Sequence, residues 1–453
     1  MPISLIMPRL KEVYMEKQRY DTGYKEVGLP QLPVDRDFMY SFYKLWFMQD
    51  GYPGKRMDDG SISAHPIYGA YIVHDYLRLF KETKEKKYIE AAKKVADATL
   101  SHMQNVPNFN AIAFYYEDYK NLSYHAGKFY SGLTQARYLT PLFRLFKITK
   151  EEKYNTAVIK ILNSLTVPQS KGGVCIQTSF GIAIEEYPHN IPTYVLNGWT
   201  TIIMELLSYS HQSKNTRAHE LALKNIATLE KIINRYDCPE ISLSRYQLTG
   251  FCYLKVISQA PKILRVNNVA TYIDHKKYGM GATNNRWNNF VCDNDIDENR
   301  YAKNRQVLMN VVLSQINDTQ MIEFEIESKS TKPGKLDFYI SYGDYNPFVS
   351  AMPTKRWIWL DQYAIQPGIN KVALQVENKN LPMIGYPTNF TKKLEDGNYN
   401  VYHWMHIHNF KKINKYYESI KLEYIKKKWM EYIKEWRRVD SLDAKNIRYL
   451  RPK

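Results

Sequence analysis

Two short patches, far apart in the chain, carry the side chains best suited to acid–base chemistry. The first, Glu185–Pro188, holds two adjacent carboxylates and a tyrosine. The second, Tyr402–His406, holds a tyrosine and two histidines. Carboxylate, imidazole and phenol groups are the usual proton donors and acceptors of enzymes. We therefore predict that both patches border a site that removes and returns a proton, although each patch alone also fits a surface turn or packed aromatic side chains.

The local sequence predicts the elements that would carry these patches. Pro188 biases Tyr187 towards an extended backbone, so the first patch is predicted on a loop or short strand. A helix is predicted to follow, with Asn197 as its N-cap or as a substrate contact and Gly198 allowing close packing. In the second patch, His403 and His406 share one face of a predicted helix. Buried, hydrogen-bonded histidines are favoured over a metal site, because no acidic third ligand is close in the sequence.

An internal repeat predicts the scaffold around these patches. The pattern Arg-Leu-Phe-Lys-x-Thr-Lys-Glu-x-Lys-Tyr at residues 78–88 recurs at 144–154. Each copy is predicted to end one helix, turn at a threonine that caps the next helix, and begin that helix. A weaker third copy covers 204–233, and residues 410–436 suit a fourth pair. Repeated helical hairpins predict a solenoid or an α/α toroid, whose loops gather around a concave mouth that suits a polysaccharide.

The pattern changes after about residue 257. Short alternating runs separated by turn residues predict the antiparallel strands of a β-sandwich. The predicted strands are Val307–Leu313, Met321–Ile326, Leu336–Ile340, Arg356–Trp359 and Lys371–Gln375. The polar stretch 265–304 is predicted as a linker.

We therefore expect a mainly α chain. Its helices would form an α/α toroid, an incomplete barrel of helical hairpins, with an inserted antiparallel β-sandwich domain. The expected divisions are an irregular segment 1–40, the first part of the toroid 41–260, a linker plus the β domain 261–398, and the rest of the toroid 399–453.

Charge and composition favour an acidic partner. Lys and Arg total 63 against 46 for Asp and Glu, a formal net charge of +17. Such an excess favours nucleic acid, an acidic membrane surface or an acidic polysaccharide. The 38 tyrosines suit a sugar site, because the apolar face of a pyranose stacks on a flat ring. No nucleic-acid recognition motif accompanies the charge, so nucleic acid is not the expected partner.

Cysteines and terminal segments carry no further signature. The 4 cysteines form no CxxC pair, so neither a zinc site nor a disulfide framework is expected. The first residues lack the apolar core of a signal peptide, and no run approaches the roughly 18 apolar residues of a membrane span. The expectation is a protein without an integral membrane segment, whose location is cytoplasmic or unknown.

The order of motifs along the chain resembles the catalytic domain of the D-glucuronyl C5-epimerases. Besides the two patches, the resemblance rests on Gly172–Val174, Val195–Gly198, Tyr236–Asp237, Tyr246, Gly127–Gln135 and, weakly, His65–Tyr71. It covers roughly 60–255 and 400–436, and the β region interrupts it. Several positions depart from the family pattern. Ile184 stands where the family has a tryptophan, and Gln247 stands where it has an aspartate. Residues Thr134–Arg137 replace its Ala-Gln-Gly-Gln segment.

The resemblance implies an enzyme that inverts C5 of glucuronate residues within a heparosan-like polymer, without a nicotinamide or other cofactor. A structural divalent cation and a homodimer stay open. The candidate catalytic residues are Tyr187, Tyr402, Glu186 and Tyr246. The candidate substrate-binding residues are Arg245, Glu185, Asn197, His403, His406, Tyr130, Gln135 and Arg137.

These candidates suggest a mechanism. Inversion needs one group on each face of the sugar, and we expect Tyr187 and Tyr402 to oppose each other, with Glu186 as base or relay and Tyr246 positioning. A tyrosine acting as base needs a nearby cation, because its usual pKa is about 10. A cation is also expected at the substrate carboxylate, from Arg245, Arg137 or Lys128.

Two other functions fit the same residues. A polysaccharide lyase begins with the same proton abstraction and then eliminates the C4 substituent. A non-catalytic glycan-binding protein would use the β domain as its binding module.

Overall fold

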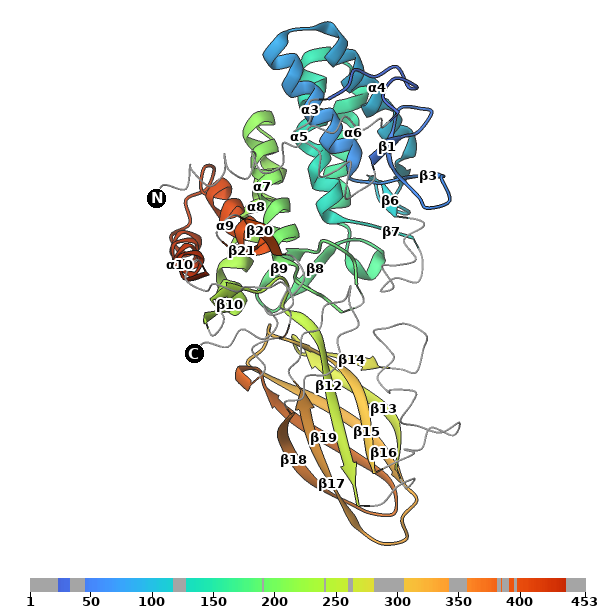
Figure 1. Ribbon diagram of the computed structural model, residues 1–453, viewed down its shortest axis with the longest axis vertical. Coiled ribbons are helices and arrows are strands. Elements are labelled where there is room, and N and C mark those ends of the chain that lie inside the picture. The colour runs from blue at the N-terminus through green and yellow to red at the C-terminus, as the bar shows by residue number, and fades with distance from the viewer. Residues whose placement is uncertain are drawn as a thin grey trace.

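The computed structural model describes residues 23–32, 45–116, 128–189, 191–239, 242–259, 264–280, 305–341, 357–380, 384, 391–394 and 397–436. Most of the predicted irregular segment 1–40, linker residues 281–304 and the chain after Trp436 lie outside the described residues. A helical part and a β-sandwich lie end to end along the molecule (Figure 1).

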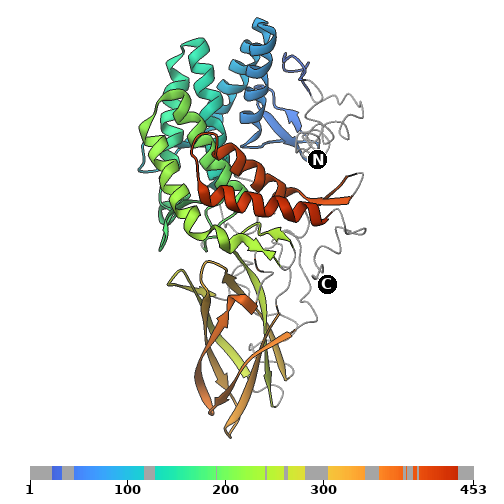
Figure 2. The same cartoon turned by 90° about the vertical axis from the view of Figure 1, so that its left-hand side faces the viewer.

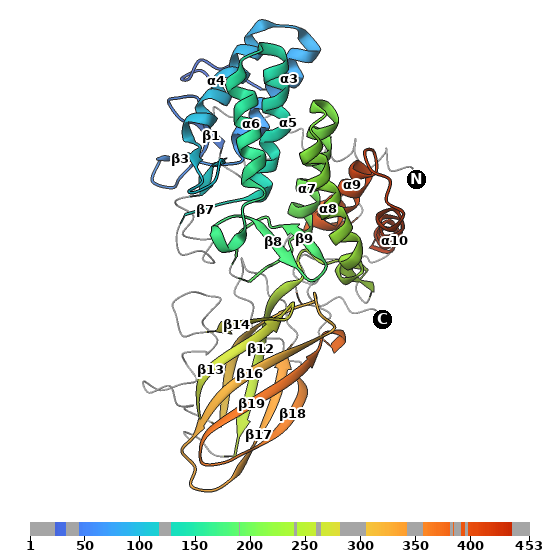
Figure 3. The same ribbon diagram turned by 180° about the vertical axis from the view of Figure 1, so that it is seen from behind.

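Within the described residues, the helical part contains four antiparallel hairpins. They are α3 (Tyr68–Thr83) with α4 (Lys86–His102), α5 (Gly132–Thr149) with α6 (Glu152–Ser164), α7 (Leu196–Ser213) with α8 (Thr216–Ile232), and α9 (Val401–Ile413) with α10 (Ile420–Trp436). The first helices of the hairpins pack in chain order, α3 on α5, α5 on α7 and α7 on α9. Figure 3 shows the resulting row of hairpins, and Figure 2 shows the C-terminal hairpin closing against the third. The predicted repeat and its fourth pair are therefore confirmed.

The repeat encodes one type of turn between helices. The hydroxyl of Thr83 donates to the Leu79 carbonyl at 2.9 Å and accepts from the Glu85 amide at 3.2 Å. Thr83 thus ends α3 and does not cap α4, which corrects the predicted N-cap. The turn residue that follows adopts a left-handed conformation in the first three hairpins, at Lys84, Lys150 and Lys214. Thr149 and Ser213 repeat the hydroxyl contacts of Thr83.

The β domain is a pair of four-stranded antiparallel sheets. One has the order β15 (Gln306–Ser314), β12 (Thr249–Ser258), β17 (Gly334–Ser341), β18 (Trp357–Ile365), and the other β14 (Lys276–Met280), β13 (Leu264–Ile273), β16 (Thr319–Ser328), β19 (Gly368–Glu377). All five predicted strands are confirmed. Alternating side chains such as Leu336, Phe338 and Ile340 are fully buried, as expected for a sandwich core.

The predicted linker is wrong for residues 265–280, which belong to the hairpin of β13 and β14. A β-bulge between Val266 and Asn268 changes which residues of β13 face the core, so apolar and polar residues do not alternate regularly along this strand. The tight turn after it uses Asp274 and His275 at positive φ in place of glycine. The β domain also begins earlier than predicted, at Thr249.

Short hairpins join the two parts and hold the first patch. β8 (Cys175–Thr178) and β9 (Gly181–Ile184) end directly before Glu185. The turn of this hairpin contacts the sandwich, where the Asp274 carboxylate accepts from the Ser179 amide at 3.0 Å. The other short strands are β1 (Leu45–Phe47), β2 (Pro53–Arg56), β3 (Ile62–Ala64), β4 (Gln104–Asn105), β5 (Ile112–Ala113), β6 (Tyr115–Tyr116), β7 (Phe129–Tyr130), β10 (Asp237–Cys238), β11 (Leu243–Ser244), β20 (Thr391–Leu394) and β21 (Gly397–Asn400). None of the helices in the described part of the chain combines the length and apolarity needed to span a membrane.

Candidate active site

The carboxylate of Glu186 lies against the first turn of α7. A β-carbon built at Gly198 would lie 2.7 Å from Glu186 Cβ and closer still to its Oε2 atom. The predicted close packing at Gly198 is therefore confirmed, and its partner is a candidate catalytic residue. The backbone of Glu186 is held as well, because its carbonyl accepts from the Gly132 amide at the start of α5, at 3.1 Å.

Three tyrosines from different segments gather around Glu186. The rings of Tyr246 and Tyr402 are in contact, with centroids 4.5 Å apart and planes at 61°. Burial raises the pKa of Tyr187 and Tyr246 well above the usual value, and the charge of Glu186 and the neighbouring Tyr402 raise both further. The four groups therefore lie close together, although they come from three widely separated segments of the chain.

Glu186 is the group in this cluster that titrates near neutral pH. It is 5% exposed, and burial raises its pKa to about 7, opposed by the neighbouring Tyr187 hydroxyl. Its Oε2 atom has no hydrogen-bond partner among the described residues. The carboxylate can thus accept a proton, whereas the phenols of Tyr187 and Tyr246 stay protonated and act as donors.

The contribution of the buried carboxyl pair to stability is expected to fall as the pH rises. Burial raises the pKa of both Glu185 and Glu186 from 4.5 to about 7. The folded state then binds protons more tightly than the unfolded state. Their contribution is therefore fully present below pH 4.5 and is lost as the pH passes through about 7. Urea unfolding across this range tests the expectation. The profile of Glu186→Gln should be flatter, and an unchanged slope would contradict the assignment.

An aromatic wall continues from Tyr187. Its ring makes edge contacts with Tyr116 and Phe129, with centroids 6.5 Å and 5.9 Å away. Tyr116 in turn meets His65, which stacks on Tyr68 at 3.9 Å. Flat apolar ring faces of this kind suit a pyranose. Tyr116 was not predicted from the sequence, whereas Phe129 lies within the segment Gly127–Gln135 and His65 within the segment His65–Tyr71, both of which supported the family resemblance.

The two histidines of the second patch hold α9 in place. His403 Nε2 lies 2.9 Å from the Trp429 carbonyl and must donate to it. Its Nδ1 atom therefore accepts, from the Ser244 amide at 2.9 Å and the Ser244 hydroxyl at 2.8 Å. That hydroxyl proton is then used, so His406 Nδ1 donates to the Ser244 oxygen at 2.8 Å. The contacts lock the helix that carries Tyr402.

Both histidines are neutral and enclosed. Burial lowers the pKa of His403 to about 4 and that of His406 well below the usual value. Each side chain is fully buried, and its hydrogen bonds hold the helix that carries Tyr402. The role of Ser244 was not predicted, because it lies far from His403 and His406 in the sequence and no local pattern marks it as their partner.

Three other expected substrate contacts are internal. The Glu185 carboxylate accepts from the Thr193 amide and hydroxyl at 3.1 and 2.7 Å and from the Tyr194 amide at 2.9 Å. The Tyr130 hydroxyl donates to the Ser164 carbonyl at 2.8 Å. Gln135 bonds to the Phe114 amide, the Ile112 carbonyl and the Ser164 hydroxyl at 3.1, 3.0 and 3.1 Å. All three side chains are buried and hold the loops around the site.

The three cations expected at the substrate carboxylate point elsewhere. Arg245 donates to the carbonyls of Arg235 and Ile384 at 2.9 and 2.8 Å. Arg137 pairs with Glu205 at 2.7 Å. Lys128 bonds to Gln104 and lies 4.6 Å from the Tyr115 ring centroid. Among the described residues, the causes of the shifted pKa of Glu186 are burial, the Tyr187 hydroxyl and the charge of Glu185, and none is a cation.

Asn197 lies inside the first turn of α7 and does not cap it, because the N-cap is Val195. Its carbonyl accepts from the Thr200 hydroxyl at 3.3 Å, and its Oδ1 atom is buried without a partner among the described residues. As for metals, the described residues contain no group of three His, Cys, Asp or Glu side chains able to hold an ion.

Comparison with known proteins supports the family resemblance. Residues 104–273 match the family model described as D-glucuronyl C5-epimerase C-terminus, so the expected resemblance is confirmed over that part of the chain. No curated protein matches the chain by sequence. A GH76 α-mannanase from Bacteroides thetaiotaomicron is 13% identical with a TM-score of 0.30 over 47% of this chain and 56% of that one. A GH76A α-1,6-mannanase from Salegentibacter sp. HEL1_6 is 12% identical with a TM-score of 0.31 over 56% and 57%. The chain thus spans little more than half of these structures.

Proposed function

We propose, on the premise of that family match, that the protein inverts C5 of D-glucuronate residues within an acidic, heparosan-like polysaccharide to give L-iduronate. The observation that carries the proposal is the gathering of Tyr187, Tyr246 and Tyr402 around Glu186, a buried carboxylate with a pKa of about 7. We interpret the row of hairpins as an incomplete α/α toroid with this cluster at its mouth.

Proton removal uses Glu186 and Tyr187 as a relay. The C5 proton passes to the Tyr187 oxygen while the Tyr187 hydroxyl proton passes to the Glu186 carboxylate. The electron pair of the C–H bond moves into the substrate carboxylate. In this route Glu186 has the relay role that was expected of it. Tyr187 transfers the proton together with Glu186 and does not act as a base by itself. A phenolate there would lack the cation that it needs, since the surrounding described groups raise the pKa of Tyr187.

Proton return uses the other pair of tyrosines. The Tyr402 hydroxyl gives its proton to C5 on the opposite face, and the Tyr246 ring in contact with it holds it in place. The cycle leaves Glu186 protonated and Tyr402 as phenolate, and exchange with solvent restores both. The extra charge on the substrate carboxylate is stabilised by phenol hydroxyl donors, because Arg245, Arg137 and Lys128 are directed elsewhere.

Incubation with heparosan in deuterated water tests the proposal. The expected result is deuterium at C5 together with new iduronate signals in the NMR spectrum, because the returned proton comes from an exchangeable hydroxyl. Rising ultraviolet absorbance from unsaturated ends, without iduronate, would show a lyase. Polymer binding without exchange or cleavage would show a glycan-binding protein.

A further inference from the structure

We propose a second binding site for the polysaccharide, a basic pocket that holds acidic sugar groups at a distance from the catalytic tyrosines. The pocket has a volume of about 520 Å³ and is lined by α3, α5, α7, α9 and the residues just after α9. A volume of this size falls in the usual range for a ligand site. This inference rests on the proposed substrate class. Its test distinguishes failure of the pocket from failure of the proposed catalytic function.

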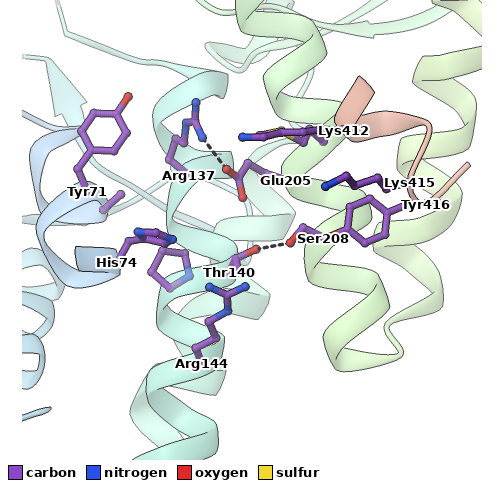
Figure 4. A pocket seen from close by; sticks show the side chains of 13 residues that line it. Tyr71, His74, Arg137, Thr140, Arg144, Glu205, Ser208, Lys412, Lys415 and Tyr416 are labelled. Atoms are coloured by element: carbon purple, nitrogen blue, oxygen red, sulfur yellow. Dashed lines mark hydrogen bonds and ion pairs between the residues drawn. The ribbon is translucent and has the colours of Figure 1, made fainter. Parts of the chain in front are cut away.

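The pocket has an excess of positive charge. Arg137 and Arg144 come from α5, and Lys412 and Lys415 face them from the end of α9 (Figure 4). Glu205 is the acidic residue among those lining the pocket, and it pairs with Arg137. Arg144 donates to the neutral amide oxygen of Gln212 at 2.8 Å, so its charge is not neutralised there.

Two lysines of the pocket form no ion pair with the part of the chain that the structure describes. Across the described residues, neither Lys412 nor Lys415 lies within salt-bridge distance of a carboxylate. Burial lowers the pKa of Lys412, and the nearby cations Arg137 and Lys415 lower it further, with only Glu205 opposing them. The fold therefore holds cations close together at an unfavourable energy, which an anionic ligand would relieve.

Other lining groups match an acidic sugar and not a bare ion. The guanidinium of Arg137 lies 5.8 Å from the ring centroid of Tyr71. The hydroxyls of Thr140 and Ser208 meet across the pocket at 3.5 Å. Cations for carboxylates, hydroxyls for sugar hydroxyls and an aromatic ring beside them are together what an acidic pyranose needs.

The position of the pocket fits a polymer held at two points. Tyr402 and Lys412 lie on the same helix, ten residues apart, and the helical rise separates them by about 15 Å. Both α5 and α7 contribute to the pocket through their middle turns, whereas Glu186 lies at the beginning of α7. A single chain running along the inner helices would therefore reach both the tyrosines and the pocket.

The test compares two double variants in heparosan binding by isothermal titration calorimetry. Lys412→Gln/Lys415→Gln should weaken binding about tenfold or more, since charge-assisted hydrogen bonds are lost, and should make binding less dependent on salt. Lys411→Gln/Lys427→Gln removes the same charge from exposed positions of α9 and α10 and should change affinity less than about twofold. Thermal unfolding checks that both variants fold.

The outcomes separate the pocket from the catalytic proposal. Equal affinity of the two double variants, or no binding of heparosan by the unmodified protein, overturns the pocket. Exchange at C5 with equal affinities would leave the catalytic function standing alone. Loss of affinity in the pocket variant, without any C5 exchange by the unmodified protein, would leave the pocket standing alone.

Discussion

Tyr402→Phe is expected to lower C5 deuterium exchange by a factor of about 10² to 10⁴, the usual contribution of a general acid or base. The substitution removes only the hydroxyl that returns the proton, while the ring that contacts Tyr246 remains. Glu186→Gln should cause a loss of the same order, because an amide cannot accept the relayed proton. The measurement is the NMR exchange rate on heparosan in deuterated water.

Tyr424→Phe is the matched control for this expectation. Tyr424 is 64% exposed on α10, so its hydroxyl should be irrelevant to exchange and to folding. Both catalytic variants should also unfold cooperatively near the wild-type urea midpoint. Exchange at the wild-type rate in Tyr402→Phe and Glu186→Gln would show that the assigned proton path is wrong.

Gly198→Ala is expected to destabilise the protein by about 1–3 kcal/mol, the usual cost of overpacking. In an ordinary helix interior the same change stabilises by about 0.5–1 kcal/mol. Here the new methyl group would overlap the Glu186 side chain, which must move away from the first turn of α7. C5 exchange should fall together with stability, because the displaced carboxylate is the proton acceptor.

A double-mutant cycle shows whether Glu186 is the cause. In a Glu186→Gly background the side chain that obstructs the methyl group is gone, so Gly198→Ala should cost much less in urea unfolding. An equal cost in both backgrounds would mean that the strain arises elsewhere in α7. Either result can be measured without any enzymatic assay.

Local patterns were sufficient for the secondary structure in most places. The repeated motif predicted the helical hairpins because the turn between them depends on neighbouring residues, such as the Thr83 hydroxyl and the Glu85 amide. The alternation of apolar and polar residues predicted β15 to β19, because it too is a property of neighbouring residues. The alternation failed to predict β13, because a bulge between Val266 and Asn268 changes which residues face the core.

The candidate site was also predicted from the sequence only in part. The sequence by itself determined which chemical groups were available, since the catalytic candidates Glu186, Tyr187, Tyr246 and Tyr402 were all identified and lie together. It did not determine which of two adjacent carboxylates is internal. That depends on which one meets Thr193 and which one meets Gly198, and neither contact is written in the local pattern.

Tertiary structure alone decided the roles of the remaining groups. Ser244 and His403 are 159 residues apart, and only the packing of α9 against β11 turns them into a hydrogen-bonded pair. Other contacts between distant segments direct Arg245 to backbone carbonyls and bring Arg137, Lys412 and Lys415 together around one pocket. The physical reason is that a residue type specifies which bonds a side chain can make, whereas the partner is set by contacts between segments that are distant in sequence.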